Sequence, residues 1–216
     1  MQGIRMPLSA SPLQGLRRVL AFLVLPSILA ASVIFPLSAT AEGKPTIGII
    51  GAGQEGGTLG TLWAKAGYKV VFASRDPTQL QALVARIGPN ASVGTASQVI
   101  DKGDVVVLAV PYHAEPEIAR QYGSRLAGKI LIDVDNAYPG RDGNIAITAR
   151  EVGIARYSAR LFAGTRFVRA FNSVNASSLG PGCGQALYSY TDDQAGQLAA
   201  ELIRAVGCTP ARGQDL

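Results

Sequence analysis

Apolar runs of strand length alternate along the chain with stretches of helical period. The strand-like runs, several of them apolar at nearly every position, are residues 46–50, 69–73, 104–110, 129–134, 166–170 and 186–190. Strands that helices cover on both faces have such continuous apolar runs, whereas half-exposed strands alternate apolar with polar residues. The pattern therefore predicts a buried sheet with helices on both of its faces.

Several segments between these runs have the period and the end signals of helices. Gly67 ends a first helix, whose apolar stripe is formed by Leu59, Leu62, Trp63 and Ala66. A second helix is expected to begin with Asp76 at the N-cap and Pro77 at the first helical position. Its buried stripe consists of Leu80, Leu83, Val84 and Ile87. A last helix is expected over about residues 193–206.

The order of these elements predicts the fold class. Strand, helix and strand in succession imply parallel pairing through right-handed crossover connections. The prediction is an α/β protein with a doubly wound, mostly parallel sheet, helices on both faces, and a short C-terminal strand-helix extension. With 216 residues, 48% of them apolar, the chain has enough apolar side chains for one substantial core.

The first 41 residues have a different composition from the rest of the chain. They hold three arginines and no acidic residue, are uncharged over residues 19–41, and end in the small residues Ala-Thr-Ala. This pattern predicts a secretory signal peptide cleaved before Glu42. An uncleaved membrane anchor and a wrongly chosen start codon are the alternatives. The domain prediction is a leader over 1–41 and one domain over 42–216, which is exported, membrane-anchored, or cytoplasmic if the leader is a start-site artefact.

Charge and cysteine content narrow the classes of partner. The net charge is +5, and removing the three leader arginines lowers it by three to +2, so the basic character gives no reason to expect a nucleic-acid partner. Cys183 and Cys208 are too few for a disulfide scaffold, and we expect two unrelated thiols, with a disulfide in an oxidising compartment as the alternative. Because His113 is the single histidine, no metal site is expected.

Three glycines follow the first predicted strand at G-x-G-x-x-G spacing. They are Gly51, Gly53 and Gly56, and a helix is expected to begin among them. In a dinucleotide-binding turn the first glycine permits the tight turn, the second lets a pyrophosphate approach backbone N–H groups, and the third allows close packing of helix and strand. The helix N-terminus adds unpaired donors and a partial positive charge. The spacing therefore predicts a Rossmann-type dinucleotide site.

The end of the second predicted strand distinguishes NADP from NAD. An NAD site usually has a carboxylate there for the ribose 2′-hydroxyl, whereas this chain has Ser74 and Arg75. A guanidinium and a hydroxyl can both bind a 2′-phosphate. Asp76 is already assigned to the N-cap of the next helix, so the sequence favours NADP.

Five segments resemble a known family in their order and spacing. IGIIGAGQEGG, SRDP, VVVLAVPYHA, LIDVDNAYP and VRAFNSVNASSL resemble the NADPH-dependent deazaflavin (coenzyme F420) reductase-like family, whose module also occurs at the cytosolic end of some membrane ferric reductases. The resemblance covers about residues 45–210. It implies an NADP-dependent oxidoreductase that transfers a hydride between NADP(H) and a deazaflavin, flavin or similar small acceptor.

The resemblance also implies roles for particular residues. Cofactor contacts are implied for the pyrophosphate turn Ala52, Gly53, Gln54 and Glu55, for the 2′-phosphate pair Ser74 and Arg75, and for Ala109, Val110 and Pro111 on the way to the nicotinamide. Asn136 and Asn172 would line the cleft of the second redox partner, although asparagine also favours the turns that follow strands. No catalytic acid or base is required, because the cofactors supply the chemistry.

The sequence leaves several alternatives open. A non-catalytic NADP-binding module that senses redox state or binds a partner is the main rival, since the family usually continues with another helix beyond the equivalent of Leu216. Membrane association through residues 19–41 and a homodimer are further possibilities. His113 follows the third long strand and could approach the nicotinamide. Asp133 and Asp135, which flank a strand end, are expected to serve turns in preference to a metal.

Overall fold

The computed structural model describes residues 43–214 and residue 216, and the predicted leader lies outside them. These described residues belong to one compact unit. Within the described part of the chain, no helix is both long enough and apolar enough to cross a membrane.

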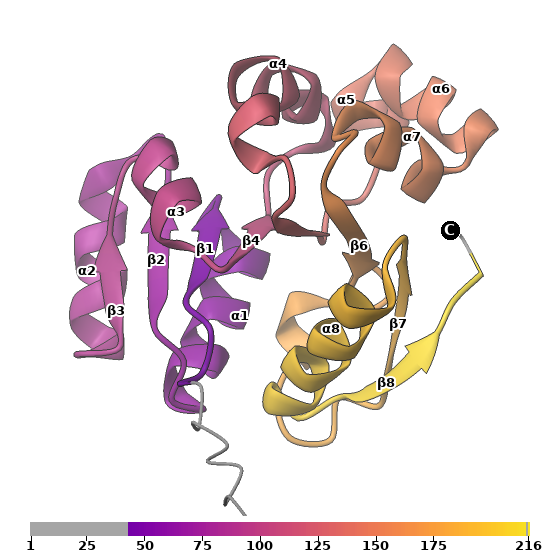
Figure 1. Ribbon diagram of the computed structural model, residues 1–216. Coiled ribbons are helices and arrows are strands. Elements are labelled where there is room, and N and C mark those ends of the chain that lie inside the picture. The colour runs from indigo at the N-terminus through magenta and orange to yellow at the C-terminus, as the bar shows by residue number, and fades with distance from the viewer. Residues whose placement is uncertain (1–42, 215) are drawn as a thin grey trace, which may run out of the picture. The chain divides into compact units, whose positions relative to one another are not determined.

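A single eight-stranded sheet runs through this unit in the order β3-β2-β1-β4-β5-β6-β7-β8 (Figure 1). All neighbouring strands are parallel except β6 and β7, which are antiparallel. The strands are β1 (Ile47–Ile50), β2 (Val70–Ala73), β3 (Ala91–Val93), β4 (Val105–Leu108), β5 (Ile130–Asp133), β6 (Arg166–Ala170), β7 (Gln185–Tyr190) and β8 (Thr209–Arg212). The predicted fold class is confirmed, and the only strands without a matching apolar run are the two edge strands β3 and β8.

Helices cover both faces of the sheet, as the apolar runs predict. They are α1 (Gln54–Lys65), α2 (Pro77–Ile87), α3 (Ala96–Lys102), α4 (Glu115–Leu126), α5 (Pro139–Asp142), α6 (Asn144–Val152), α7 (Ile154–Leu161) and α8 (Asp193–Ala205), with short 3-10 turns at Tyr112–Ala114 and Ala176–Ser178. Side chains of α1, α2 and α8 pack on one face, and those of α3, α4 and α7 pack on the other. Helices α5, α6 and α7 gather beside α4 (Figure 1).

The second helix begins as its sequence predicts. The Asp76 side chain caps α2 by accepting hydrogen bonds from the backbone N–H groups of Thr78 and Gln79. Leu80 is buried on the inner side of the helix, and the rest of its stripe is partly buried against the same core. The cap and the stripe together hold the turn between β2 and α2 in place, and this turn carries Ser74 and Arg75.

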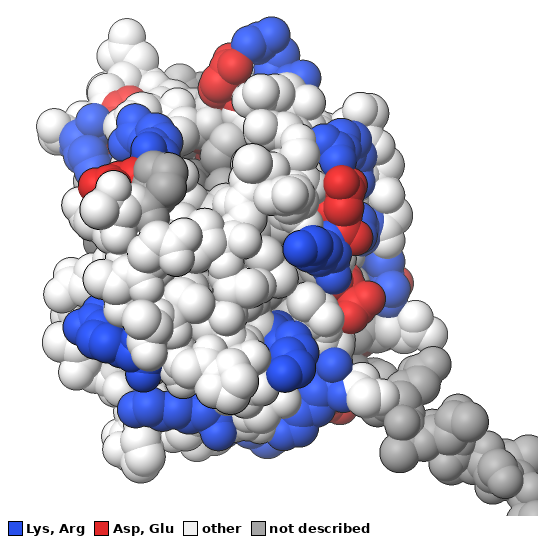
Figure 2. All heavy atoms as spheres, turned by 90° about the vertical axis from the view of Figure 1, so that its left-hand side faces the viewer, with Lys and Arg blue, Asp and Glu red and all other residues white. Residues whose placement is uncertain are grey.

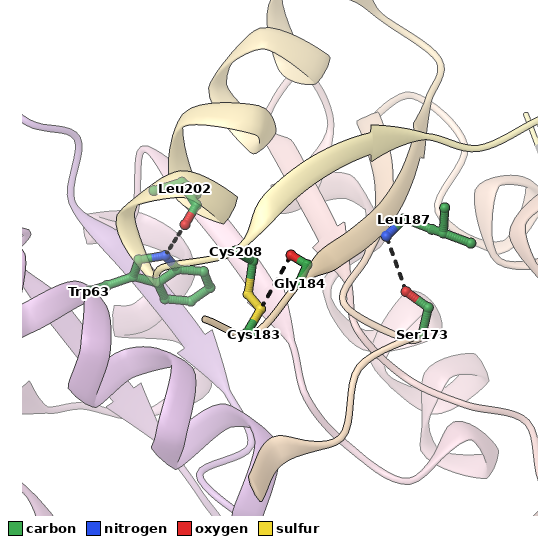
Figure 3. The surroundings of a disulfide bond; sticks show 7 residues. All are labelled: Trp63, Ser173, Cys183, Gly184, Leu187, Leu202 and Cys208. Atoms are coloured by element: carbon green, nitrogen blue, oxygen red, sulfur yellow. Dashed lines mark hydrogen bonds between the residues drawn. A yellow bond between two sulfur atoms is a disulfide. The ribbon is translucent and has the colours of Figure 1, made fainter. Parts of the chain in front are cut away.

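The two cysteines form a disulfide, so the expectation of unrelated thiols is wrong. Cys183 precedes β7 and Cys208 precedes β8, and their Cα atoms are 5.0 Å apart (Figure 3). Because β7 and β8 pair side by side, the segments that lead into them come close enough to be bridged. Nearby, the Trp63 indole donates to the Leu202 carbonyl at 2.9 Å and links α1 to α8. The disulfide therefore fastens the C-terminal extension beside this link.

Charged side chains surround a largely uncharged area on the side of the unit that carries α2 and β3. Lys and Arg gather toward the lower edge of this face, while acidic and basic side chains alternate along its right-hand edge (Figure 2). Alternating charges of opposite sign partly cancel at that edge, and the basic character of this face lies mainly along its lower rim.

Candidate functional site

The glycine turn after β1 has the three geometric features expected of a dinucleotide-binding turn. Gly51 has φ +99°, and a Cβ there would lie 2.2 Å from the Ala109 carbonyl oxygen, so the first position requires glycine. A Cβ at Gly56 would lie 2.1 Å from the Gly51 carbonyl oxygen, so the third position permits close packing of α1 on the strands. A Cβ at Gly53 would meet nothing within 4 Å. The second position is therefore open to a ligand.

The N-terminus of α1 faces this opening without a side-chain cap. Gly53 is the N-cap residue, and no side chain accepts from the first N–H groups of the helix. These donors and the helix dipole are suited to an anion. Glu55 lies in the first turn, where burial raises the pKa of its carboxyl to about 7, and its Oε1 atom is buried without a hydrogen-bond partner. A partly neutral carboxyl repels an approaching phosphate less than an ionised one would.

A cavity of about 550 Å³ joins most of the predicted cofactor residues. Its lining includes Gly51, Ala52 and Gly53 from the glycine turn, Ser74 and Arg75 after β2, and Ala109, Val110 and Pro111 after β4. Two other predicted residues lie outside this cavity. Gln54 lines a neighbouring groove between α1 and α2, and Gly56 packs against Ala109. The cavity lies where the strand order reverses between β1 and β4, the switch point at which doubly wound sheets bind ligands.

Ser74 and Arg75 are both exposed at the rim of this cavity. The Ser74 hydroxyl oxygen accepts from the Asp76 backbone N–H at 3.2 Å, which leaves its own proton free to be donated. Within the described residues, no carboxylate lies within salt-bridge distance of the Arg75 guanidinium. The pair therefore presents one uncompensated positive charge and one free donor. With the open position at Gly53, these groups fit a dinucleotide that carries an extra phosphate.

His113 lines the same cavity and is held by a carboxylate. Its Nδ1 atom is 3.0 Å from Asp142 Oδ1, and its backbone N–H donates to the same oxygen at 3.3 Å. Hydrogen bonds from Arg141, Tyr138 and His113 hold the pKa of Asp142 well below its usual range, against the opposing effect of its burial. The carboxylate thus stays ionised and fixes the orientation of the imidazole.

Asn136 and Asn172 line a second cavity, of about 380 Å³, beyond the carboxyl ends of β5 and β6. The Asn136 side-chain amide donates to the Asn172 carbonyl at 3.1 Å and so joins the segments that follow the two strands. The structure therefore brings the two asparagines together, but in a different cavity from the glycine turn. Both cavities lie at the same edge of the sheet, because β1, β4, β5 and β6 are parallel neighbours.

A buried ionic cluster lies beneath this edge, and the sequence pattern did not identify two of its members, Glu115 and Arg169. Asp133 pairs with Arg169 at 2.5 Å and also accepts from the Asp135 backbone N–H at 2.7 Å, so the expected turn is only part of its role. Oxygens of Glu115, Asp133 and Asp135 lie within 4.8 Å of one another. Burial raises the pKa of Glu115 to about 9 and that of Asp135 well above its usual range. Protonated carboxyls are poor metal ligands, and Arg169 already supplies the positive charge.

The fold and the first cavity define a class of protein. A doubly wound parallel sheet with an open glycine turn at its first crossover is a Rossmann-type dinucleotide-binding domain. Comparison with known families narrows this class: residues 46–137 match the family described as NADP oxidoreductase coenzyme F420-dependent. The resemblance seen in the sequence motifs is confirmed.

Individual relatives agree with this assignment. The metalloreductase STEAP3 of Rattus norvegicus is 31% identical over 170 residues, which cover 77% of this chain and 33% of the relative. The F420-dependent NADP reductase of Methanothermobacter thermautotrophicus is 29% identical over 141 residues, with 60% and 61% coverage. A solved hypothetical protein from Sinorhizobium meliloti superimposes with a TM-score of 0.66 at 29% identity, with 78% and 84% coverage. The chain thus spans about a third of the length of the metalloreductase, and both of these curated relatives are named as reductases.

Proposed function

We propose that this protein is an NADP-dependent oxidoreductase that passes a hydride from NADPH to a deazaflavin, a flavin or a similar small acceptor. One observation carries the proposal: the 550 Å³ cavity joins the open glycine position at Gly53 to the guanidinium of Arg75, which pairs with no carboxylate of the described residues. The first feature suits a pyrophosphate and the second a 2′-phosphate. The NADP oxidoreductase family of residues 46–137 supports the same cofactor.

Each part of the cavity has a distinct task in this proposal. The backbone N–H groups at the start of α1 bind the pyrophosphate, and Ser74 and Arg75 bind the 2′-phosphate. Val110 and Pro111 line the apolar part of the cavity and exclude water from the reacting end of the cofactor. When bound, NADPH supplies the hydride, and the protein needs only to hold donor and acceptor close together and shielded from water.

A binding titration of the full chain with NADPH and NADH tests the cofactor assignment. Arg75→Ala should weaken NADPH binding by about 1.5 to 3 kcal/mol, the usual loss for a hydrogen bond to a charged group, and should leave NADH binding almost unchanged. Arg204→Ala, which removes an exposed arginine from the last turn of α8, is the matched control and should change neither. Equal losses for both nucleotides in Arg75→Ala would contradict the assignment of the 2′-phosphate.

Turnover of the same sample with deazaflavin and flavin acceptors tests the reaction. Oxidation of NADPH that depends on one of these acceptors supports an enzyme. Tight binding of NADPH without oxidation by any of them would instead support the rival function, an NADP-binding module that senses redox state. The two experiments thus separate the cofactor from the chemistry.

We further propose that residues 42–216 reach an oxidising compartment through the leader. The Cys183–Cys208 disulfide supports this location, because such bonds persist outside the reducing cytoplasm. Alkylation of free thiols in cell fractions tests it. Protection of both cysteines in the exported fraction is expected, and two alkylated cysteines in a cytoplasmic protein would refute it.

A further inference from the structure

The 380 Å³ cavity beyond β5 and β6 has a strongly basic lining. Three arginines contribute to it, and no acidic residue does, among the residues that the structure describes. The remaining lining residues are Asn136, Gly153, Ile154, Ala155, Asn172 and Gln214. A concave site with several positive charges and amide groups is suited to an anion.

Arg169 is the buried member of the three and shapes the floor of the cavity. Its side chain is 3% exposed, and its charge is balanced from below by Asp133. Its Nη2 atom donates to the Asp135 carbonyl at 2.6 Å. When the Asn172 amide is oriented so that its oxygen faces these donors, the oxygen accepts from Arg169 Nε and Nη2 at 2.6 and 2.8 Å. Arg169 therefore fixes Asn172 at the wall and contributes little free charge.

Arg150 and Arg156 supply the free charge. Both are exposed, and no carboxylate among the described residues lies within salt-bridge distance of either guanidinium. Arg150 Nη1 donates to the Ala137 carbonyl at 3.2 Å, which holds this side chain near the segment that follows β5. Two guanidinium groups that pair with no carboxylate of residues 43–214 thus line one small cavity.

The start of α7 adds backbone donors to the same cavity. Gly153 is its N-cap residue and offers no side chain, so the first N–H groups of α7 have no side-chain partner. Ile154, Ala155 and Arg156, which carry these N–H groups, all line the cavity. The partial positive charge at the N-terminus of α7 therefore has the same sign as the charges of the two arginines.

We propose that this cavity binds an anionic group of the hydride acceptor, a phosphate or a carboxylate, through Arg150, Arg156 and the start of α7. The inference rests on the proposed function and adds the substrate class: the acceptor is acidic. The phosphates of the dinucleotide already have their partners in the first cavity, after β1 and β2. The basic cavity lies further along the same sheet edge, after β5 and β6, where a second ligand has room.

FMN and riboflavin test this inference, since they share one ring system and differ by a phosphate. Titration of the full chain, followed by flavin fluorescence, should show FMN binding at least about 10-fold more tightly than riboflavin. The double variant Arg150→Gln/Arg156→Gln should remove most of this difference by weakening FMN alone. Arg160→Gln/Arg204→Gln makes the same change of charge at two other exposed arginines and should leave the difference intact.

Competition identifies the chemical group. Inorganic phosphate that displaces FMN at lower concentration than malonate indicates a phosphate site, and the reverse order indicates a carboxylate site. Equal binding of FMN and riboflavin by the wild-type protein, or no binding of either, would overturn the inference, as would equal weakening of both by the double variant. None of these measurements requires NADPH. A failure of NADPH binding would contradict the proposed function, and it would not produce any of the results that would overturn this inference.

Discussion

Gly53 allows the proposed nucleotide site to be separated experimentally from the fold that holds it. A Cβ at this position meets nothing within 4 Å, and its φ of −71° and ψ of −159° are accessible to alanine. Alanine is a poorer N-cap than glycine by about 0.5 to 1 kcal/mol, but it also restricts the unfolded chain by about 0.4 to 1 kcal/mol. These effects oppose each other, so Gly53→Ala should change the free energy of unfolding by no more than about 0.5 kcal/mol.

Binding of NADPH should respond very differently. The added methyl group occupies the space through which a pyrophosphate reaches the N–H groups at the start of α1. Loss of a hydrogen bond to a charged group costs about 1.5 to 3 kcal/mol, which corresponds to a dissociation constant raised at least about 10-fold. Isothermal titration calorimetry with NADPH measures this change, and a thermal melt should show Tm within about 2 °C of the wild type.

Gly56→Ala is the matched control for this experiment. Its Cβ would lie 2.1 Å from the Gly51 carbonyl oxygen and 2.9 Å from the Ala109 Cβ, so α1 must move. Overpacking of this kind costs about 3 kcal/mol, which lowers Tm by about 6 to 12 °C. Unchanged NADPH affinity in Gly53→Ala, or a loss of stability as large as that of Gly56→Ala, would refute the assignment of Gly53 to the ligand.

Three further predictions concern stability. Cys183→Ser/Cys208→Ser should lower the free energy of unfolding in urea by about 3 kcal/mol, because the bond closes a loop with a sequence separation of 25, and reducing agent should then have no further effect. Arg169→Leu should lower the free energy of unfolding by about 3 to 5 kcal/mol, because it leaves Asp133 buried and unpaired. Asp133→Leu/Arg169→Leu should regain much of this loss. A double variant as unstable as the single one would contradict the pairing. Burial raises the pKa of Glu115 from 4.5 to about 9, so the folded state holds a proton that the unfolded state releases, and stability should fall as pH rises between these values. Glu115→Gln should flatten this fall in thermal melts, and an unchanged slope would count against the shifted pKa.

The sequence predicted those parts of the molecule that local patterns determine. The apolar runs of β1 and β4 and the cap of α2 at Asp76 each depend on neighbouring residues, and all appear in the structure. The glycine spacing similarly predicted the turn at Gly51 and the packing at Gly56. Edge strand β8 was missed because it contains Pro210, which usually argues against a strand and is tolerated at an edge.

The buried cluster and the disulfide depend on register, which local patterns do not contain. Asp133 meets Arg169 because the two are register partners in β5 and β6, separated in the chain by three helices. Nothing in the residues around either one specifies this pairing. Similarly, a separation of 25 residues says nothing about the 5.0 Å between the Cα atoms of Cys183 and Cys208, which follows from the pairing of β7 with β8.

The same register explains why one sheet edge can serve two ligands. Neighbouring strands lie about 4.8 Å apart, so the ends of β2 and β4, with β1 between them, are separated by about 10 Å, and the end of β6 lies about 10 Å beyond β4. Arg75, Gly53 and Pro111 follow β2, β1 and β4 and line the first cavity, whereas Asn136 and Asn172 follow β5 and β6 and line the second. A ligand extended along the first three strand ends would therefore present its far end toward the basic cavity. Hydride transfer requires two reactants side by side, and the strand order provides two adjacent places along one edge.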